Sequence, residues 1–318
     1  MKTNNDHGRP DRVALGVSLV LLSTLLTSLA EVTFRYASGE GLVWQYFFWR
    51  SLLSVPVLLA IAFVWGEGAA TVLQALRPWP LVRSLLFVLM FITVYAALPF
   101  IPLATLAAGL YTSPLFVAAL SPLVTGEPVR WRGWFAIALG FSGVLLILQP
   151  GTGSFTWLAL LPVAGGLCYA LSALLTRSKC RAVPPATLGV SMNLAMVAVS
   201  AMVSVALLVL EPPARIVALS PFLLGSWQVF GATEWFYVGV LTLLMVANSL
   251  IVSAAYQAAP SAIIVTFDYN YLIFMTLFGF AFFAETPNLL TVAGMVLIAG
   301  AGMTVMRSAG HKKNAAGR

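Results

Sequence analysis

Long apolar runs, separated by short polar breaks, make up most of this chain. The first run begins at Val13 after a polar start and continues to about Ala37. A helix needs about 20 apolar residues to span the ~30 Å of hydrocarbon in a bilayer, and most runs reach that length. A β-barrel would instead show alternating segments of ~10 residues. The pattern therefore predicts an all-α integral membrane protein.

Ten transmembrane helices fit between the breaks, which carry proline, glycine or charge. The run Gln149-Pro150-Gly151, for example, ends one predicted helix before the next begins. The longest connection, 211–233, contains prolines and leaves room for a helix lying in the membrane interface. The predicted spans are about 13–37, 42–65, 80–100, 102–125, 131–148, 157–176, 184–210, 234–257, 260–284 and 288–306.

Composition agrees with this class and excludes others. Apolar residues make up 60% of the chain and charged residues 8%, whereas a soluble domain carries roughly 25% charged residues. Two cysteines, Cys168 and Cys180, give no disulfide framework. No His, Cys or carboxylate cluster has metal-ligand spacing, and no glycine-rich phosphate loop is present. We therefore expect no metal and no cofactor.

The net charge of +7 is distributed as a topology signal rather than as a nucleic-acid patch. With ten helices and a cytoplasmic N-terminus, only three of the 17 Lys and Arg residues fall on or toward the outside. Cytoplasmic loops of membrane proteins carry the excess of Lys and Arg. This asymmetry predicts cytoplasmic termini and no nucleic-acid partner. The three exceptions are Arg35, Arg50 and Arg215.

Two stretches, 96–148 and 254–306, carry prolines and glutamates at matching positions when they are aligned with an offset of 158 residues. Pro102 then falls on Pro260, and Glu127 falls on Glu285. Glu127 ends a predicted helix at the inner face and Glu285 at the outer face, so the two halves have opposite orientations. Such inverted repeats are common in secondary transporters, with the substrate site between the halves. The predicted division is a tail 1–12, repeats 13–150 and 154–307, and a basic tail 308–318.

Short motifs recur along 13–306: Phe48-Trp49-Arg50-Ser51, Leu81-Val82-Arg83-Ser84-Leu85, Pro102-Leu103-Ala104, Ser113-Pro114-Leu115-Phe116, Gly126-Glu127-Pro128 with Gly133, Gly140 and Gly143, Pro260-Ser261-Ala262, Phe267-Asp268-Tyr269 and Ala284-Glu285. With these motifs the chain resembles EamA-type members of the drug/metabolite transporter superfamily. That resemblance implies ten helices as two inverted five-helix repeats, a central cavity and transport of a small metabolite. An arginine in the second helix, with an acidic residue and a tyrosine in the ninth, resembles the branch that includes S-adenosylmethionine uptake carriers.

Ionisable residues inside the spans are the candidate site, because a charge in hydrocarbon is costly and normally faces protein or water. Asp268 lies eight residues into the ninth span, roughly 12 Å deep. It is followed by Tyr269, Asn270 and Tyr271, a run poorly suited to face lipid. Two interpretations stay open for Asp268. It either binds a cationic group or a coupled proton in a cavity, or it is a buried side chain hydrogen-bonded to a neighbouring helix.

Other polar residues in the spans carry paired interpretations. Glu31 and Arg35, four apart on one helix, are expected to form an ion pair. Arg50 has no local partner, and either holds a substrate carboxylate or pairs with Glu31 or Asp268. Arg83 is interpreted as a substrate contact or as a side chain that snorkels to the interface.

The remaining candidates are weaker. Tyr95 and Tyr111 are expected to line the cavity, and Asn248 either lines it or packs helix against helix. Glu127 and Glu285 are interpreted as turn residues near helix N-termini, where a carboxylate is favoured. The predicted substrate-binding residues are Asp268, Tyr269, Tyr271, Arg50, Tyr111, Tyr95, Asn248 and Glu31.

These observations predict a secondary carrier of the bacterial-type inner membrane that works by alternating access. Its partners are the bilayer and a small polar metabolite with a cationic or zwitterionic group, amino-acid-like or S-adenosylmethionine-like. One alternative is an exporter of amino acids, drugs or other metabolites that uses Asp268 for proton coupling. An integral membrane enzyme needs paired acid and base groups or a nucleophile near a histidine, which the spans lack. A non-transporting assembly or receptor subunit is the other rival. Substrate, direction and oligomeric state stay open.

Overall fold

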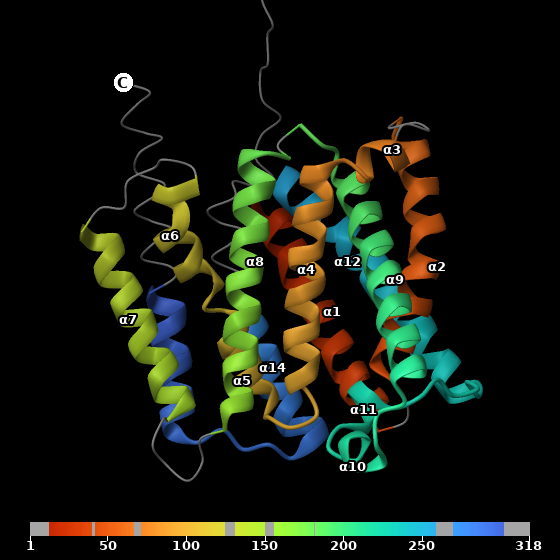
Figure 1. The fold of residues 1–318 in the computed structure, drawn as a ribbon. Coiled ribbons are helices and arrows are strands. Elements are labelled where there is room, and N and C mark those ends of the chain that lie inside the picture. The colour runs from red at the N-terminus through yellow and green to blue at the C-terminus, as the bar shows by residue number, and fades with distance from the viewer. Residues whose placement is uncertain are drawn as a thin grey trace, which may run out of the picture.

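The computed structural model describes residues 13–39, 42–66, 71–124, 131–149, 156–180, 182–258 and 270–301. Every regular element in these ranges is a helix, and the helices stand side by side as a bundle (Figure 1). The elements are α1 Val13–Ala37, α2 Val43–Val64, α3 Thr71–Ala75, α4 Pro78–Ala97, α5 Leu103–Leu110, α6 Ser113–Val124, α7 Trp131–Leu148, η1 Trp157–Ala159, α8 Leu160–Ser178, α9 Pro185–Leu210, α10 Ala214–Val217, α11 Pro221–Leu224, α12 Ala232–Ala258 and α14 Asn270–Phe283. A C-terminal helix follows at Leu289–Ala301.

Length and hydropathy make six of these helices long and apolar enough to cross a membrane, and four shorter apolar helices accompany them. Large apolar side chains cover the outward surfaces, as at Val64 and Leu210, which are 81% and 75% exposed. Water would penalise an apolar surface of this extent, whereas lipid does not. The chain is therefore a multi-pass integral membrane protein.

The predicted span limits agree closely with several helices and fail at one. The first and fifth spans coincide with α1 and α7. The fourth span, expected to run unbroken over 102–125, is instead divided at Tyr111 and Thr112 into α5 and α6. Pro114 has no N–H to bond back along the helix, and the Thr112 hydroxyl donates to the Gly109 carbonyl at 2.6 Å. The span is therefore divided between α5 and α6.

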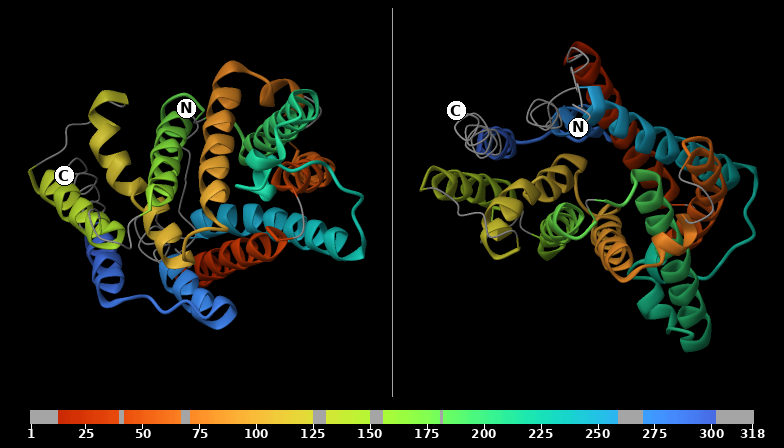
Figure 2. Two further views of the ribbon diagram at one scale, coloured as in Figure 1. Left: turned by 60° about the horizontal axis from the view of Figure 1, so that its bottom comes forward. Right: turned by 90° about the horizontal axis from the view of Figure 1, so that it is seen from above.

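Neighbouring helices of the bundle come from distant parts of the chain. α1 packs on α12 and α14, and α4 packs on α8 and α9. α2 packs on α9, and these two helices run in opposite directions in Figure 1. Figure 2 places α7 and the C-terminal helix at one side of the bundle and α2 and α9 at the other. Long-range pairing, rather than neighbours in sequence, builds the core.

Two glycines set one of these contacts. A Cβ added to Gly143 of α7 would lie 2.7 Å from the Gly294 carbonyl oxygen, and a Cβ added to Gly294 would lie 2.6 Å from that of Gly143. Small residues allow such close approach of helix backbones in membranes. The C-terminal helix is therefore seated on α7 through paired glycines.

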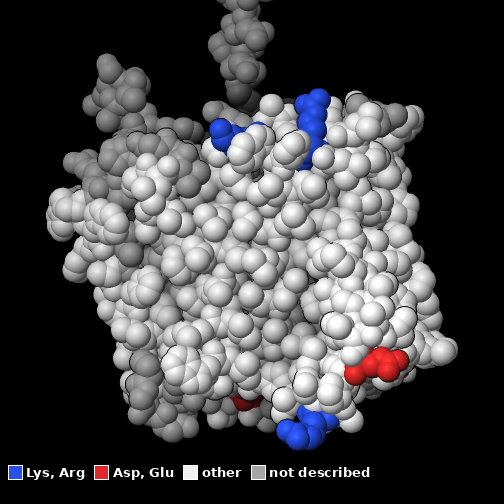
Figure 3. Space-filling view, in the orientation of Figure 1, with Lys and Arg blue, Asp and Glu red and all other residues white. Residues whose placement is uncertain are grey.

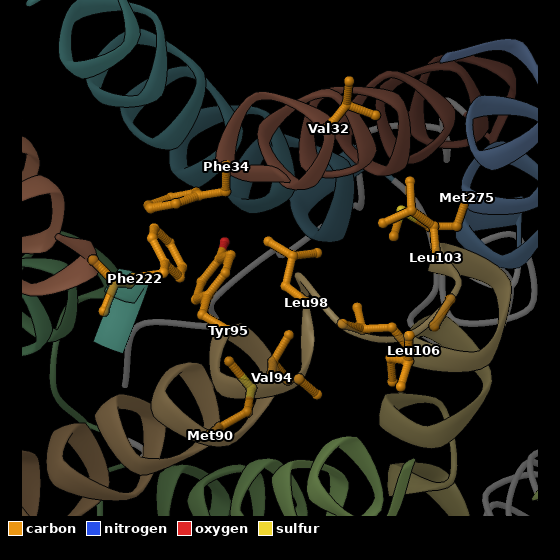
Figure 4. Close-up of a cluster of buried hydrophobic side chains, with 14 of the residues drawn as sticks. Val32, Phe34, Met90, Val94, Tyr95, Leu98, Leu103, Leu106, Phe222 and Met275 are labelled. Carbon is orange, nitrogen blue, oxygen red and sulfur yellow. The ribbon is translucent and has the colours of Figure 1, made fainter. Parts of the chain in front are cut away.

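The core fills the space between α1, α4, α5 and α14. Phe34 and Tyr95 lie at one end of the cluster drawn in Figure 4, and Leu103 and Met275 at the other. Phe34 and Leu103 are each 0% exposed. This apolar packing surrounds the few buried ionisable side chains.

The two ends of the bundle differ in charge. Figure 3 shows basic side chains at both ends of the visible face and acidic ones at its lower end. We call the end where α4 begins and α8 ends the basic end, and the opposite one the acidic end. The basic end carries Arg77, Arg83 and Lys179, and the acidic end carries Glu211, Arg215, Glu234 and Glu285.

Candidate functional site

Arg50 of α2 lies deep in the bundle, and its side chain is 2% exposed. Its guanidinium faces three aromatic rings, with centroid distances of 5.2 Å to Phe47, 5.4 Å to Phe91 and 5.5 Å to Phe34. Cations attract ring faces at this range, more strongly when water is excluded. The sequence identified Arg50, but the aromatic side chains around it come from α1, α2 and α4 and were not predicted as a set.

Glu31 of α1 and Tyr95 of α4 complete the group around Arg50. The Tyr95 hydroxyl donates to Glu31 Oε1 at 3.4 Å, a long bond. Glu31 and Tyr95 are 4% and 2% exposed, and Glu31 lies close enough to Arg50 for their charges to interact. We call Glu31, Arg50 and Tyr95 the buried polar cluster.

Several polar atoms of this cluster are unsatisfied. Glu31 Oε2 and Arg50 Nε and Nη2 are buried without a hydrogen-bond partner among the residues that the structure describes. A buried polar atom left unpaired costs ~1–3 kcal/mol, more when charged. Such a cost in a folded protein indicates a site that a ligand, water or a moving side chain completes.

The predicted ion pair between Glu31 and Arg35 is wrong. Arg35 Nη2 instead lies 2.9 Å from Glu285 Oε1, and Arg35 Nη1 donates to the Ile101 carbonyl at 2.6 Å. Its guanidinium also covers the Phe283 ring at 4.9 Å. Helix spacing made Glu31 the nearest acid in sequence, but the packing of α1 against α4 and α14 gives the two side chains different partners.

Glu285 is a turn residue, but it caps a helix other than the one predicted. Its Oε2 accepts from the Leu103 N–H at 2.7 Å, at the N-terminus of α5. The following C-terminal helix is capped by Asn288, whose Oδ1 accepts from Thr291 N at 2.8 Å. We call Arg35, Glu285 and the α5 N-terminus the acidic-end latch. Glu127, the predicted counterpart, lies outside the described residues.

Tyr111 and Tyr271, two of the predicted substrate-binding residues, lie in contact with each other. Their rings stack with centroids 4.9 Å apart and planes at 17°, which joins the break after α5 to α14. Asp268 and Tyr269, placed first among the candidates, lie outside the described residues.

Two other predicted residues make helix–helix contacts. Asn248 of α12 accepts a hydrogen bond from Ser23 of α1 at 2.6 Å, so it joins two long helices. Arg83 donates to Thr176 Oγ1 at 3.2 Å and to the Leu188 carbonyl at 3.4 Å. Both bonds tie α4 to α8 and α9 near the basic end.

A cavity of about 260 Å³ opens beside Glu285, just below the ~300–1,000 Å³ of typical ligand pockets. Among the described residues, no group of three or more His, Cys, Asp or Glu side chains could hold a metal ion. This cavity was not predicted from the sequence, because its wall combines α5, α7, α14, the C-terminal helix and the connections between them. Its polar lining includes Thr105, Gln149, Thr156, Glu285, Asn288 and Thr291.

Comparison with known proteins finds one matching family model and one similar solved structure. The EamA-like transporter family model matches residues 14–149. A crystal structure with 18% sequence identity superposes with a TM-score of 0.59 and covers 93% of this chain and 96% of its own. The chain therefore shares its fold with a solved protein over nearly its whole length.

Curated relatives with transporter names align along most of the chain. The riboflavin transporter of Rhizobium johnstonii is 29% identical and covers 94% of this chain and 93% of its own. The S-adenosylmethionine uptake transporter of Rickettsia prowazekii is 24% identical, covering 92% of each. The pseudopaline exporter of Pseudomonas aeruginosa is 26% identical, covering 94% and 98%. These names are those of transporters rather than enzymes, and together with the EamA-like match over residues 14–149 they support an EamA-type transporter of the drug/metabolite transporter superfamily.

Proposed function

We propose that this chain is a secondary carrier for a small polar metabolite with a cationic or zwitterionic group, bound at the buried polar cluster. The observation that carries the proposal is the unsatisfied chemistry of that cluster: Glu31 Oε2 and Arg50 Nε and Nη2 lack partners among the described residues. The Glu31 carboxylate can accept hydrogen bonds and the Arg50 guanidinium can donate them, and both are buried. Together they suit a ligand that carries a positive and a negative group.

The depth of the cluster fits a site reached from one side at a time. Arg50 is seven residues from the start of α2 at the acidic end, about 10 Å at 1.5 Å per residue. Glu31 is six residues from the end of α1, at a similar depth of about 9 Å. Access from either end therefore requires helices to move, as alternating access does.

Inverted repeats are supported by the pattern of helix contacts. The order of the long helices in each half relates α1 to α8, α2 to α9 and α4 to α12. Under this exchange the contact of α4 with α8 becomes that of α12 with α1, and the contact of α4 with α9 becomes that of α12 with α2. The reciprocal approach of Gly143 and Gly294 follows the same exchange of α7 with the C-terminal helix. We therefore place the moving interface between residues 13–150 and 154–307.

The distribution of Lys and Arg supports an inner-membrane location with both termini in the cytoplasm. The basic end, which carries Arg77, Arg83 and Lys179, would then face inward. The buried polar cluster would lie nearer the outer surface, and the acidic end would face outward.

The experiment compares metabolite pools in cells with and without the gene, and then measures flux of each hit in proteoliposomes. Riboflavin and S-adenosylmethionine are the first compounds to test for uptake, because relatives bear those names. Flux should require the chain and fall in Arg50→Lys, which keeps the charge but not the planar fork of donors. Absence of flux for every hit would favour the non-transporting rival, and a chemically altered product would favour an enzyme.

Asp268 is tested by Asp268→Asn in the same assay. We expect transport to fall while folded protein stays in the membrane, because the amide removes a charge with little change in volume. A proton gradient that drives export in the native chain but not in Asp268→Asn would favour the exporter alternative. Normal flux by Asp268→Asn would remove this residue from the site.

A further inference from the structure

Glu285 takes part in two features of the acidic end at once. Its carboxylate forms the ion pair with Arg35 at 2.9 Å, and it also lines the cavity of about 260 Å³. Of the described residues that line this cavity, Glu285 alone is charged. The cavity therefore presents a negative wall with neutral polar groups around it.

The position of Glu285 depends on an unfavourable backbone conformation at the preceding residue and on a close approach to a glycine. Ala284 has φ of 54°, a left-handed conformation that is unfavourable for a residue with a Cβ. The carboxylate lies over Gly279, where an added Cβ would be 2.7 Å from Glu285 Oε2. Residues held in such conformations cluster at functional sites, and here the constraint aims one carboxylate at three groups: Arg35, the α5 N-terminus and the cavity.

The latch closes the acidic end over the buried polar cluster. Arg35 lies one helical turn beyond Glu31 on α1, and it bonds the Ile101 carbonyl in the α4–α5 connection. Glu285 belongs to the segment after α14 and bonds Leu103 N. The latch thus joins α1, the α4–α5 connection and the end of α14, between the wall of the cavity and the turn of α1 that carries Glu31.

We propose that the cavity is the outer vestibule of the carrier, a weak binding site for small hydroxyl-bearing organic cations, and that Arg35 and Glu285 form the gate between it and the buried polar cluster. A cation in the vestibule competes with Arg35 for Glu285 Oε1. Once Glu285 pairs with the ligand, Arg35 is released and α1 can separate from α14. The proposal rests on the proposed carrier function, since a gate has meaning only on a transport path.

The test uses the full-length chain in nanodiscs, where both ends meet the solvent. Cys168 and Cys180 are replaced by alanine, and Val32→Cys is the reporter. Val32 is 5% exposed and lies one turn inward from Arg35. The reagent is a sulfonate-bearing methanethiosulfonate, which stays out of lipid. Glu285→Gln keeps an oxygen for Leu103 N but loses the ion pair, so the labelling rate should rise about tenfold, as loss of a charge-assisted bond implies.

Arg35→Met distinguishes opening of the gate from a change in the local concentration of the charged reagent. The reagent is anionic, so removing an acid and removing a base would change its local concentration in opposite directions. A gate predicts faster labelling in both variants. Glu234→Gln is the matched control, because Glu234 also accepts a backbone N–H, from Gly231 at 2.7 Å, but makes no ion pair among the described residues. Unchanged labelling in Glu285→Gln and Arg35→Met would overturn the gate.

Ethanolamine tests the vestibule, with ethylene glycol as the neutral analogue and sodium chloride to match ionic strength. Ethanolamine should raise the labelling rate of Val32→Cys severalfold when Arg35 and Glu285 are unchanged. It should leave the rate unchanged when Glu285→Gln is also present. Equal effects of ethanolamine and ethylene glycol would overturn the cation site. Flux of the unmodified protein is measured separately. Flux without a labelling change refutes the gate alone, and a labelling change without any metabolite flux refutes the carrier function.

Discussion

Two arginine–glutamate groups, the acidic-end latch and the buried polar cluster, lie about one turn of α1 apart, and their contacts differ. In the acidic-end latch, Arg35 has an ion pair, a carbonyl acceptor and the Phe283 ring. In the buried polar cluster, Arg50 has aromatic rings, and its Nε and Nη2 are unpaired among the described residues. The latch is partly exposed, 17% and 15% for its two side chains, whereas Arg50 is 2% exposed.

The comparison shows that residue type does not decide the role of a charged pair in this membrane protein. Glu31 and Arg35 are four residues apart on one helix, yet one belongs to the cluster and the other to the latch. A pair with complete hydrogen bonding stabilises the fold, whereas a buried charge without it is costly. We therefore expect substitutions in the two groups to change stability in opposite directions.

The largest expected effect comes from removing both charges of the buried polar cluster with Glu31→Gln and Arg50→Met together. Transport should fall about 100-fold or more, because the ligand loses both counter-charges. Thermal stability should rise, since replacing buried charges by apolar or neutral groups is often stabilising by ~1–4 kcal/mol. Proteoliposome flux and a thermal unfolding curve measure the two effects.

Its matched control is Ser23→Ala, which removes the bond from Ser23 to Asn248 at 2.6 Å and touches no charge. That variant should keep transport and lose a little stability. If the double variant were instead less stable than the native chain, the cluster would be a structural pair like the latch, and the contrast between the two groups would disappear.

The latch is broken by Arg35→Met combined with Glu285→Gln. This variant should lose about 1–3 kcal/mol of unfolding free energy, the usual cost of losing charge-assisted hydrogen bonds in a partly buried place. The binding groups of the buried polar cluster stay in place, so flux should change less than in the Glu31→Gln and Arg50→Met double variant. Thermal unfolding followed by flux at a permissive temperature tests this. A neutral effect on stability would mean that packing alone holds α1 to α14.

A similar loss of stability is expected where packing rather than charge holds the acidic-end cavity in shape. Gly143→Ala should cost ~1–3 kcal/mol by overpacking, because the new Cβ would lie 2.7 Å from the Gly294 carbonyl oxygen. Gly239→Ala is the control, since nothing lies within 4 Å of a Cβ there; it should be neutral or slightly stabilising. Equal unfolding temperatures for the two variants would contradict the close helix contact.

The smallest effect is expected from Tyr95→Phe. The bond from Tyr95 to Glu31 is long, 3.4 Å, so its loss should cost at most about 1 kcal/mol and change transport by less than about tenfold. A loss of transport as complete as that of the double variant would place the Tyr95 hydroxyl in direct contact with the ligand.

Much of the fold could be predicted because membrane helices follow local rules. The limits of α1 and α7 agree with the apolar runs, since each helix must satisfy its backbone within the hydrocarbon. The break in the fourth span was missed although Pro114 stands beside it. Proline is tolerated in membrane helices when neighbours satisfy the freed groups, so Pro114 alone did not predict a break.

The candidate site was predicted less completely. The sequence selected Arg50, Glu31 and Tyr95 separately, because polar residues are rare in the spans, and the structure brings them together. Their aromatic surroundings and the latch were not predicted. Those contacts join α1 with α2, α4 and α14, and one sequence contains no direct record of which helices touch.

The sequence by itself determined that the chain enters the membrane, how often apolar segments recur and which few residues carry charge inside them. These properties depend on transfer of each segment from water to lipid, which is local. Only the tertiary structure decided that Arg35 pairs with Glu285 instead of Glu31, and that Arg50 lies among phenylalanine rings. Partner choice depends on distances between side chains far apart along the chain, and packing of whole helices fixes those distances.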